Sequence, residues 1–142
     1  MTDSGSRRGA GRRSPAAVEF RVAALLENLA VLRTLVGAVG TCADLDFDAV
    51  ADLRLAVDEA CTRLIRSATP GATLVVLVDP RDDAIVVEAS TSCDTDDVVP
   101  EGSFSWHVLS SLTDEVQTFH RDHDDDPVFG ITLTTRRAVA RQ

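Results

Sequence analysis

An amphipathic stretch between an acidic cluster and a Pro-Gly pair constrains the fold of this chain more than any other feature. Asp44 and Asp46 offer N-cap oxygens at its start, and Pro70-Gly71 ends it. Between them, small and aliphatic side chains recur at helical spacing, at Leu53, Ala56, Val57, Ala60, Leu64 and Ala68. A helix with one apolar stripe must bury that stripe, so the chain must build a second layer against it.

The remaining segments supply that second layer. Two apolar runs at 74–78 and 84–89 are predicted as strands joined by a turn, and Phe129, Ile131 and Leu133 alternate with threonines in the last strand. The other predicted elements are a strand at 18–22, a helix at 25–39, an irregular acidic segment at 90–102, a helix at 104–113, and strands at 116–119 and 128–135. This order predicts an α+β fold, a two-layer sandwich with helices on one face of a mixed sheet.

The predicted first helix is apolar on nearly every side. In a small domain such a helix is either deeply buried or partly covered by another protein. One stripe holds Leu25, Leu29, Leu32, Val36 and Val39, while Leu26, Val31 and Leu35 lie outside it.

Length and composition predict one globular domain preceded by a tail. The chain has 142 residues, and residues 1–16, rich in Arg, Gly and Ser, predict a disordered tail before a domain at 17–138. No apolar run approaches the ~18 residues of a membrane span, and no signal-peptide core follows the N-terminal arginines. The three widely spaced cysteines fit neither a disulfide framework nor a zinc site. We therefore expect a cytoplasmic protein with no membrane partner.

Charge is distributed unevenly along the chain. The net charge is −9, although the first 16 residues are basic, and all 14 basic residues are arginines. Acidic runs at 94–97 and 122–126 give the body a charge that a phosphate backbone would repel, which argues against direct nucleic-acid binding. A protein partner with a basic surface is a better match, although a negative charge can also serve solubility alone.

Three segments, taken in chain order, carry a resemblance to a known family. The sequence LRLAVDEACTRLI at 53–65 resembles the N-box helix of the RsbW-type serine kinases, which are anti-sigma factors of the histidine-kinase-like ATPase (GHKL) superfamily. Residues 102–116 resemble the post-lid helix of that family, and residues 130–133 resemble its closing Gly-Thr strand. The element order agrees over nearly the whole folded body, and the actinobacterial members are the most similar.

The resemblance implies a function carried out through other proteins. A member of this family binds and sequesters an alternative sigma factor, which blocks the engagement of RNA polymerase. A STAS-domain anti-anti-sigma factor releases the sigma factor, and the family implies a homodimer. Intact members are also serine/threonine-protein kinases that bind ATP and phosphorylate the antagonist, and this activity is the alternative for the present chain.

The family's nucleotide site implies a set of residues that this chain has changed. Glu59 occupies the place of the N-box carboxylate, the candidate catalytic base. Arg63 replaces the Asn that ligates Mg²⁺, and a guanidinium, which has five donors and no acceptor, cannot ligate a cation. Serines and Asp94 occupy the places of the family's adenine-binding Asp and phosphate-contacting glycines: Ser90, Ser92, Ser103 and Ser105.

This combination predicts a degraded ATP site. We expect no cofactor, with weak binding of ATP and Mg²⁺, or direct contact between Arg63 and a phosphate, as alternatives. Glu59 and Arg63 have the i, i+4 spacing of an intrahelical ion pair. No metal site is predicted, because His107, His120 and His123 are not at ligand spacing with any cysteine.

The family's partner-binding arginine falls on Arg33. The resemblance implies that Arg33, with Leu32 and Val36 around it, contacts both the sigma factor and its antagonist. An arginine with apolar neighbours is a common interface anchor. Spacing alone slightly favours a solvated arginine or one whose stem lies along a core helix, and the resemblance reverses that preference.

Overall fold

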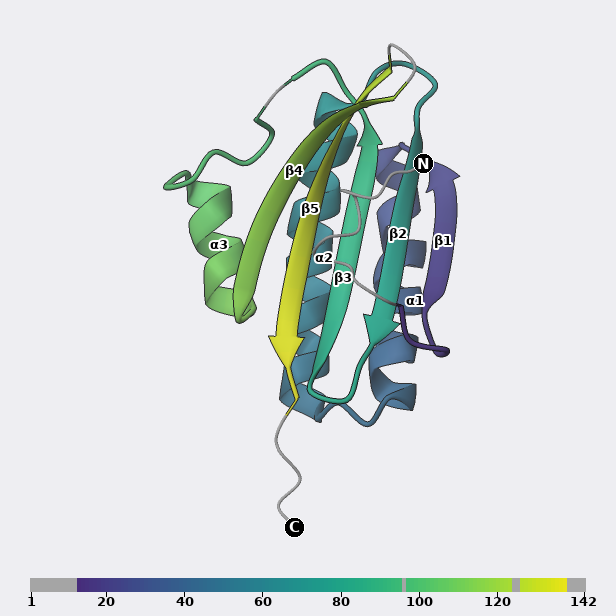
Figure 1. Ribbon diagram of the computed structural model, residues 1–142, viewed down its shortest axis with the longest axis vertical. Coiled ribbons are helices and arrows are strands. Elements are labelled where there is room, and N and C mark those ends of the chain that lie inside the picture. Colours follow the sequence, from purple (N-terminus) through teal and green to yellow (C-terminus); the bar gives the residue numbers. More distant parts are fainter. Residues whose placement is uncertain (1–12, 96, 124–125, 138–142) are drawn as a thin grey trace.

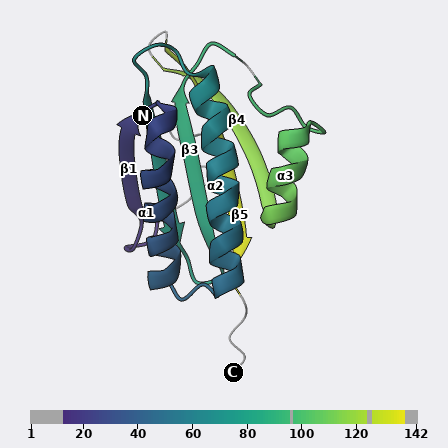
Figure 2. The ribbon, with the colours of Figure 1, turned by 180° about the vertical axis from the view of Figure 1, so that it is seen from behind.

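The computed structural model describes residues 13–95, 97–123 and 126–137. One layer holds the helices and the other a single five-stranded sheet, as Figures 1 and 2 show from opposite sides. The elements are β1 (Val18–Ala23), η2 (Leu26–Asn28), α1 (Leu29–Cys42), α2 (Phe47–Ser67), β2 (Thr73–Pro80), β3 (Ala84–Ser92), α3 (Phe104–Leu112), β4 (Glu115–His123) and β5 (Asp126–Arg136). The predicted α+β sandwich with helices on one face is confirmed.

The sheet is antiparallel throughout, so the prediction of a mixed sheet was wrong. The strand order is β1-β2-β3-β5-β4, and all four neighbouring pairs are antiparallel. Two helices connect β1 to β2. The first runs back along the sheet and the second returns, so β2 starts at the end where β1 stops and runs antiparallel to it. A single helix connects β3 to β4, which therefore run parallel, but β5 lies between them and pairs with both (Figure 1).

Helix α2 forms as its sequence pattern predicts. The Asp46 side chain caps it by accepting a hydrogen bond from the Ala49 N–H at 2.8 Å. The helix ends at Ser67, and Gly71 takes a positive φ of 78° in the turn that follows. Along its length the predicted stripe is buried from Leu53 to Leu64, and it packs in the core with the inner face of the sheet.

Helix α1 begins and ends later than the pattern predicts. It is preceded by the short η2 turn, so Leu25 is exposed instead of lying on the buried stripe, and Leu26, predicted outside the stripe, is exposed as well. It continues through Gly40, where the predicted helix had already ended, and stops at Cys42. The chain reverses at Asp44, which adopts a left-handed φ of 64° that the Asp side chain tolerates. The apolar pattern did not contain this turn, because it depends on one residue's backbone conformation.

Two strands are longer than predicted. β2 continues through Pro80, and β3 continues through Ser92 into the segment expected to be irregular. Ser90 pairs with Val75 on one side and Gly130 on the other. Strand ends are therefore set by the hydrogen-bonded ladder, which polar residues join as well as apolar ones.

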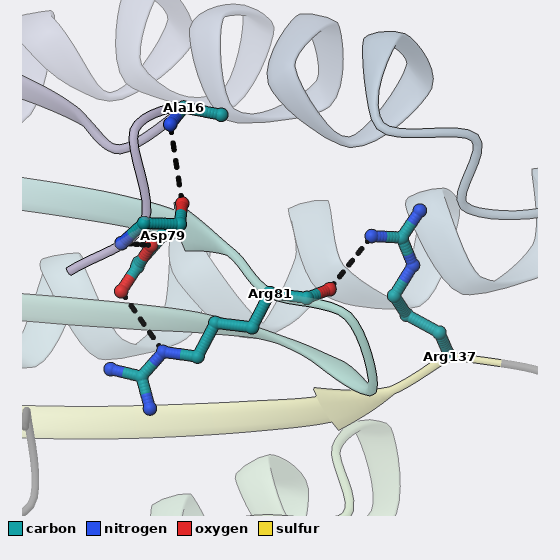
Figure 3. A network of polar contacts seen from close by, with 5 residues as sticks. Ala16, Asp79, Arg81 and Arg137 are labelled. Atoms are coloured by element: carbon teal, nitrogen blue, oxygen red, sulfur yellow. Dashed lines mark hydrogen bonds and ion pairs between the residues drawn. The ribbon is translucent and has the colours of Figure 1, made fainter. Parts of the chain in front are cut away.

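A buried carboxylate joins several segments at the end of β2 (Figure 3). Asp79, which was expected in an exposed turn, is only 1% exposed. Its Oδ1 accepts a hydrogen bond from the Ser14 N–H at 3.0 Å, and its Oδ2 pairs with Arg81 Nε at 2.9 Å. The Arg81 carbonyl accepts from Arg137 Nη1 at 2.8 Å, and Arg137 Nη2 also donates to the Ala43 carbonyl.

These contacts set the ionisation of Asp79. Burial favours the neutral acid, but the hydrogen bonds from Ser14 and the Arg81 charge outweigh it, and the pKa of Asp79 is lowered from its ordinary value of 3.8.

Residues 1–12 of the predicted tail, and residue 138 of the predicted domain, lie outside the described residues. Within the described part of the chain, no helix is both long and apolar enough to cross a membrane.

Candidate functional site

Helix α2 carries polar side chains toward both neighbouring helices. It lies between α1 and α3 in the helical layer, as Figure 2 shows. Asp58 and Glu59 are adjacent in sequence, and consecutive helical residues point about 100° apart. Asp58 therefore meets α1, while Glu59 meets α3. The two sides make two separate clusters, one around Arg33 and one around Arg63.

The α2–α3 cluster holds three of the residues predicted for the nucleotide site. Ser105 Oγ donates a hydrogen bond to Glu59 Oε2 at 2.6 Å, which fixes the carboxylate. Arg63 Nε lies 3.7 Å from the same Glu59 oxygen, one helical turn away. Arg63 Nε is itself buried and has no hydrogen-bond partner among the described residues. The i, i+4 ion pair predicted from the spacing is confirmed, although at this distance it is a weak contact.

Ser103 has a structural role at the start of α3. Its hydroxyl accepts a hydrogen bond from the Trp106 N–H at 3.2 Å, as the N-cap of the helix. Its φ is −72°, so no glycine is needed there. The positive φ of the segment, 88°, is at Gly102, one residue earlier.

Ser90 and Ser92 are not part of this cluster, so the five residues predicted as one degraded ATP site do not lie together. Side chains alternate between the two faces of β3, and the face toward the helices carries Ala89, Thr91 and Cys93, all of them buried. Ser90 and Ser92 therefore point to the opposite, helix-free face of the sheet. The prediction ended β3 at Ala89 and did not apply the alternation beyond it.

The helix-free face holds a shallow groove of mixed charge. Ser92 Oγ donates to Asp126 Oδ2 at 2.8 Å within it. Arg121 stacks on the Phe119 ring, 4.6 Å from its centroid. The ring itself covers Gly130, where a Cβ would come within 2.0 Å of the Phe119 Cζ. The groove lining also includes Arg13, Glu19, Arg21, Glu88 and Ser90.

The arrangement at Arg63 does not fit a magnesium-bound nucleotide. The position that the family uses for a metal ligand holds a permanent positive charge, and the carboxylate nearest to it is occupied by Ser105 and Arg63. No group of three or more His, Cys, Asp or Glu side chains in the described part of the chain could hold a metal ion. The cluster can hold an anion or a hydrogen-bonding group. To a cation it offers the Glu59 carboxylate, which Ser105 and Arg63 already share.

The α1–α2 cluster holds Arg33, and its geometry corrects two predicted neighbours. Arg33 Nε pairs with Asp58 Oδ1 at 3.3 Å, and both side chains are more than a third exposed. Leu32 and Val36, predicted to contact a partner beside Arg33, are 0% exposed and lie in the core. Their i, i+4 spacing places them on the helix face that packs against α2 and the sheet, so neither can reach another protein.

One exposed apolar side chain on α1 and one on α2 lie outside the predicted buried stripes. Val31, at the start of α1, is 51% exposed, and Leu55 of α2 is 55% exposed. Leu25 and Leu26 add a further exposed apolar pair just before α1. Of the two alternatives predicted for this helix, burial on every side does not hold, because Val31 is exposed; coverage by another protein stays a prediction.

The contacts of two carboxylates were missed from the sequence. Asp58 was placed on the polar side of α2 with no partner, because its contact with Arg33 joins residues 25 positions apart. Asp79 was placed in a turn, although an Asp directly after a run of five apolar residues is a signal for a buried strand end. Neither pairing can be derived without the register of the helices and strands.

The cysteines do not form a reactive site. Cys61 and Cys93 are buried, while Cys42 is exposed at the end of α1. Burial, helped by the nearby Asp58 charge, raises the pKa of the Cys61 thiol to about 12. Cys61 therefore stays a neutral thiol in the core at physiological pH.

Comparisons with known proteins agree on one family. Residues 22–128 match the family model of the histidine kinase-like ATPase domain. The chain is 66% identical over 143 residues to the anti-sigma-F factor RsbW of Mycobacterium tuberculosis (strain H37Rv), covering 99% of this chain and 85% of that protein. It is 21% identical over 145 residues to the serine-protein kinase RsbW of Bacillus cereus (strain AH187), covering 88% of this chain and 86% of that protein.

Proposed function

The chain belongs to the histidine kinase-like ATPase domain family, and from this premise we propose that it is an anti-sigma factor that binds and sequesters an alternative sigma factor. The observation that carries the proposal is the 66% identity, over nearly the whole chain, to a protein named for its action on sigma-F. The partly exposed Arg33, together with the exposed apolar side chains of Val31 and Leu55 on the same two helices, supports a protein-binding surface on α1 and α2. Binding there would keep the sigma factor from RNA polymerase.

Arg33 tests this proposal directly. We expect Arg33→Ala to weaken binding of a sigma-F-type factor by about 30-fold, because truncating an arginine anchor costs about 2 kcal/mol. Isothermal titration calorimetry with the purified sigma factor measures the effect. Arg21→Ala is the matched control, since Arg21 is also an exposed arginine with one carboxylate partner, Glu19 at 2.9 Å, but lies on the helix-free face. Equal losses in both variants would contradict a surface centred on Arg33.

The finer partners of the family enter as part of the same proposal. We propose that a STAS-domain anti-anti-sigma factor competes for the surface around Arg33, that the chain acts as a homodimer, and that it works in the cytoplasm. The net charge of −9 supports partners with basic surfaces. Competition titration with a STAS-domain protein tests the first point, and the sedimentation coefficient of the purified chain tests the second.

Serine kinase activity is the second candidate function, and the Bacillus relatives named serine-protein kinase favour it. The contacts of Arg63 and Glu59 weigh against it, as the metal-ligand position is cationic. We therefore propose that the protein acts by binding alone and that its nucleotide site is degraded.

Restoring a metal ligand should recover part of the nucleotide site. We expect Arg63→Asn to strengthen binding of Mg-ATP by about tenfold or more, because one hydrogen bond or ligand bond to a charged group contributes about 1.5–3 kcal/mol. Calorimetric titration with ATP, with and without Mg²⁺, measures the change. Arg66→Asn, which removes an exposed arginine one turn away, should leave nucleotide binding unchanged. Tight Mg²⁺-dependent binding by the unmodified chain would refute a degraded site.

A further inference from the structure

The contact between Arg33 and Asp58 uses only one edge of the guanidinium. Asp58 Oδ1 meets Arg33 at Nε, 3.3 Å away, and does so across the seam between α1 and α2. Among the described residues, no acceptor pairs with the terminal Nη1 and Nη2 groups of Arg33. A guanidinium holds its five donors in one rigid plane, so an acceptor at Nε also fixes the direction of the two outer nitrogens.

The two outer nitrogens can together donate two parallel hydrogen bonds to a carboxylate. In Arg33 they remain available to another molecule, because the side chain is 38% exposed. An arginine that is free to rotate loses side-chain entropy when a partner immobilises it, and this loss weakens binding. A carboxylate on the same protein that already holds the guanidinium removes part of that cost before binding.

The seam between the two helices is built so that a short carboxylate can reach Arg33. One turn further along α1, Gly37 leaves space for the Arg54 stem, and a Cβ on Gly37 would lie 2.8 Å from Arg54 Cδ. The glycine therefore allows α2 to approach α1 closely at this level. Asp58 follows Arg54 by one turn on α2, at the height of Arg33. Thr62 Oγ1 bonds to the Asp58 carbonyl at 2.7 Å and leaves the Asp58 carboxylate to Arg33.

We propose that Asp58 is a positioning residue that holds the outer face of Arg33 toward the partner, and that this partner presents a carboxylate or carbonyl oxygen to Arg33. The proposal rests on the proposed function, since it concerns the same binding surface. It assigns to Asp58 of α2 a part in recognition through Arg33 of α1. A competing role, in which Asp58 blocks Arg33 until a partner displaces it, predicts the opposite sign for the removal of Asp58.

Asp58→Asn tests the sign. The amide keeps the size of the side chain but loses the charge that attracts Arg33. We expect binding of the sigma-F-type factor to weaken by about fivefold, within the range that the ordering of one side chain accounts for. Asp58→Glu, which keeps the negative charge, should lose less affinity than Asp58→Asn. Asp52→Asn is the matched control, because Asp52 is an exposed carboxylate on the same helix and makes no ion pair with any described residue.

A double-mutant cycle separates positioning from a general effect on the fold. In the Arg33→Ala background, Asp58→Asn should cause no further loss, and thermal unfolding should show the Asp58→Asn chain as stable as the Asp52→Asn control. Unchanged or tighter binding by Asp58→Asn, or an equal loss in both backgrounds, would overturn the role of Asp58 while the proposed function stands. Absence of sigma-factor binding by the unmodified chain would overturn the proposed function and the role of Asp58 together.

Discussion

Leu32→Ala should destabilise the protein by about 2–5 kcal/mol, the largest loss expected from any single substitution considered for this chain. Leu32 is 0% exposed and belongs to the core between α1, α2 and the sheet. Truncation removes apolar contacts and leaves a cavity that the rigid neighbours fill only in part. Denaturant unfolding followed by circular dichroism measures the change in the free energy of unfolding.

The neighbouring residue provides the control. Val31 is next to Leu32 on the same helix but is 51% exposed, so Val31→Ala should change stability by less than about 0.5 kcal/mol. Because Leu32 cannot touch a partner, the fraction of Leu32→Ala that stays folded should bind the sigma factor with unchanged affinity. If Leu32→Ala kept its full stability but lost sigma-factor binding, the original assignment of Leu32 to the interface would be right after all.

Periodicity predicted the elements well, because it reports which face of an element is buried. The α2 stripe from Leu53 to Leu64 and the alternation of Phe129, Ile131 and Leu133 are both buried as the sequence pattern indicates. The same reasoning gave the helices on one side of a sheet. It could not give strand directions, since the place of β5 between β3 and β4 depends on long-range pairing that no local pattern encodes.

The candidate site was predicted only in part, and the failures have a common cause. Glu59, Arg63 and Ser105 were placed together correctly because two of them share one helix and the third begins the next. Ser90 and Ser92 were assigned to the same site, but β3 continues to Ser92 and the alternation of its side chains directs both serines to the helix-free face. Arg33 itself is partly exposed, as an interface residue requires, but it pairs with Asp58, while Leu32 and Val36 lie in the core.

The two clusters on α2 suggest how one helix could lose one function and keep another. Asp58 and Glu59 face different helices, so changes around Glu59 and Arg63 need not disturb the pairing at Arg33. Residues more than about 7–10 Å apart with no shared partner usually act independently. Arg63→Asn should therefore leave sigma-factor affinity unchanged. Isothermal titration calorimetry with the sigma factor, as for the Arg33 variant, measures this.

Asp79 gives the fold a dependence on pH that can be separated from the binding surface. Its carboxylate joins Ser14 to β2 and Arg81, and the Arg81 carbonyl accepts from Arg137 (Figure 3). The folded pKa of Asp79 is lowered, so the unfolded chain binds its proton at a higher pH than the folded chain does. The stabilisation is complete above the unfolded pKa, near 4, and is lost as the pH falls through the lower folded pKa.

Asp79→Asn should therefore cost about 2–3 kcal/mol at pH 7, because it replaces buried hydrogen bonds to a charged group and turns an amide N–H toward Ser14 or Arg81. The difference in unfolding free energy between the unmodified and Asp79→Asn chains should stay constant from about pH 5 to pH 8 and shrink below about pH 4. Asp82→Asn, in the exposed turn nearby, should show neither effect. Urea unfolding across this pH range measures both curves. A difference that grows as the pH falls would mean that Asp79 is protonated in the folded protein, and the charged network at the end of β2 would then be wrong.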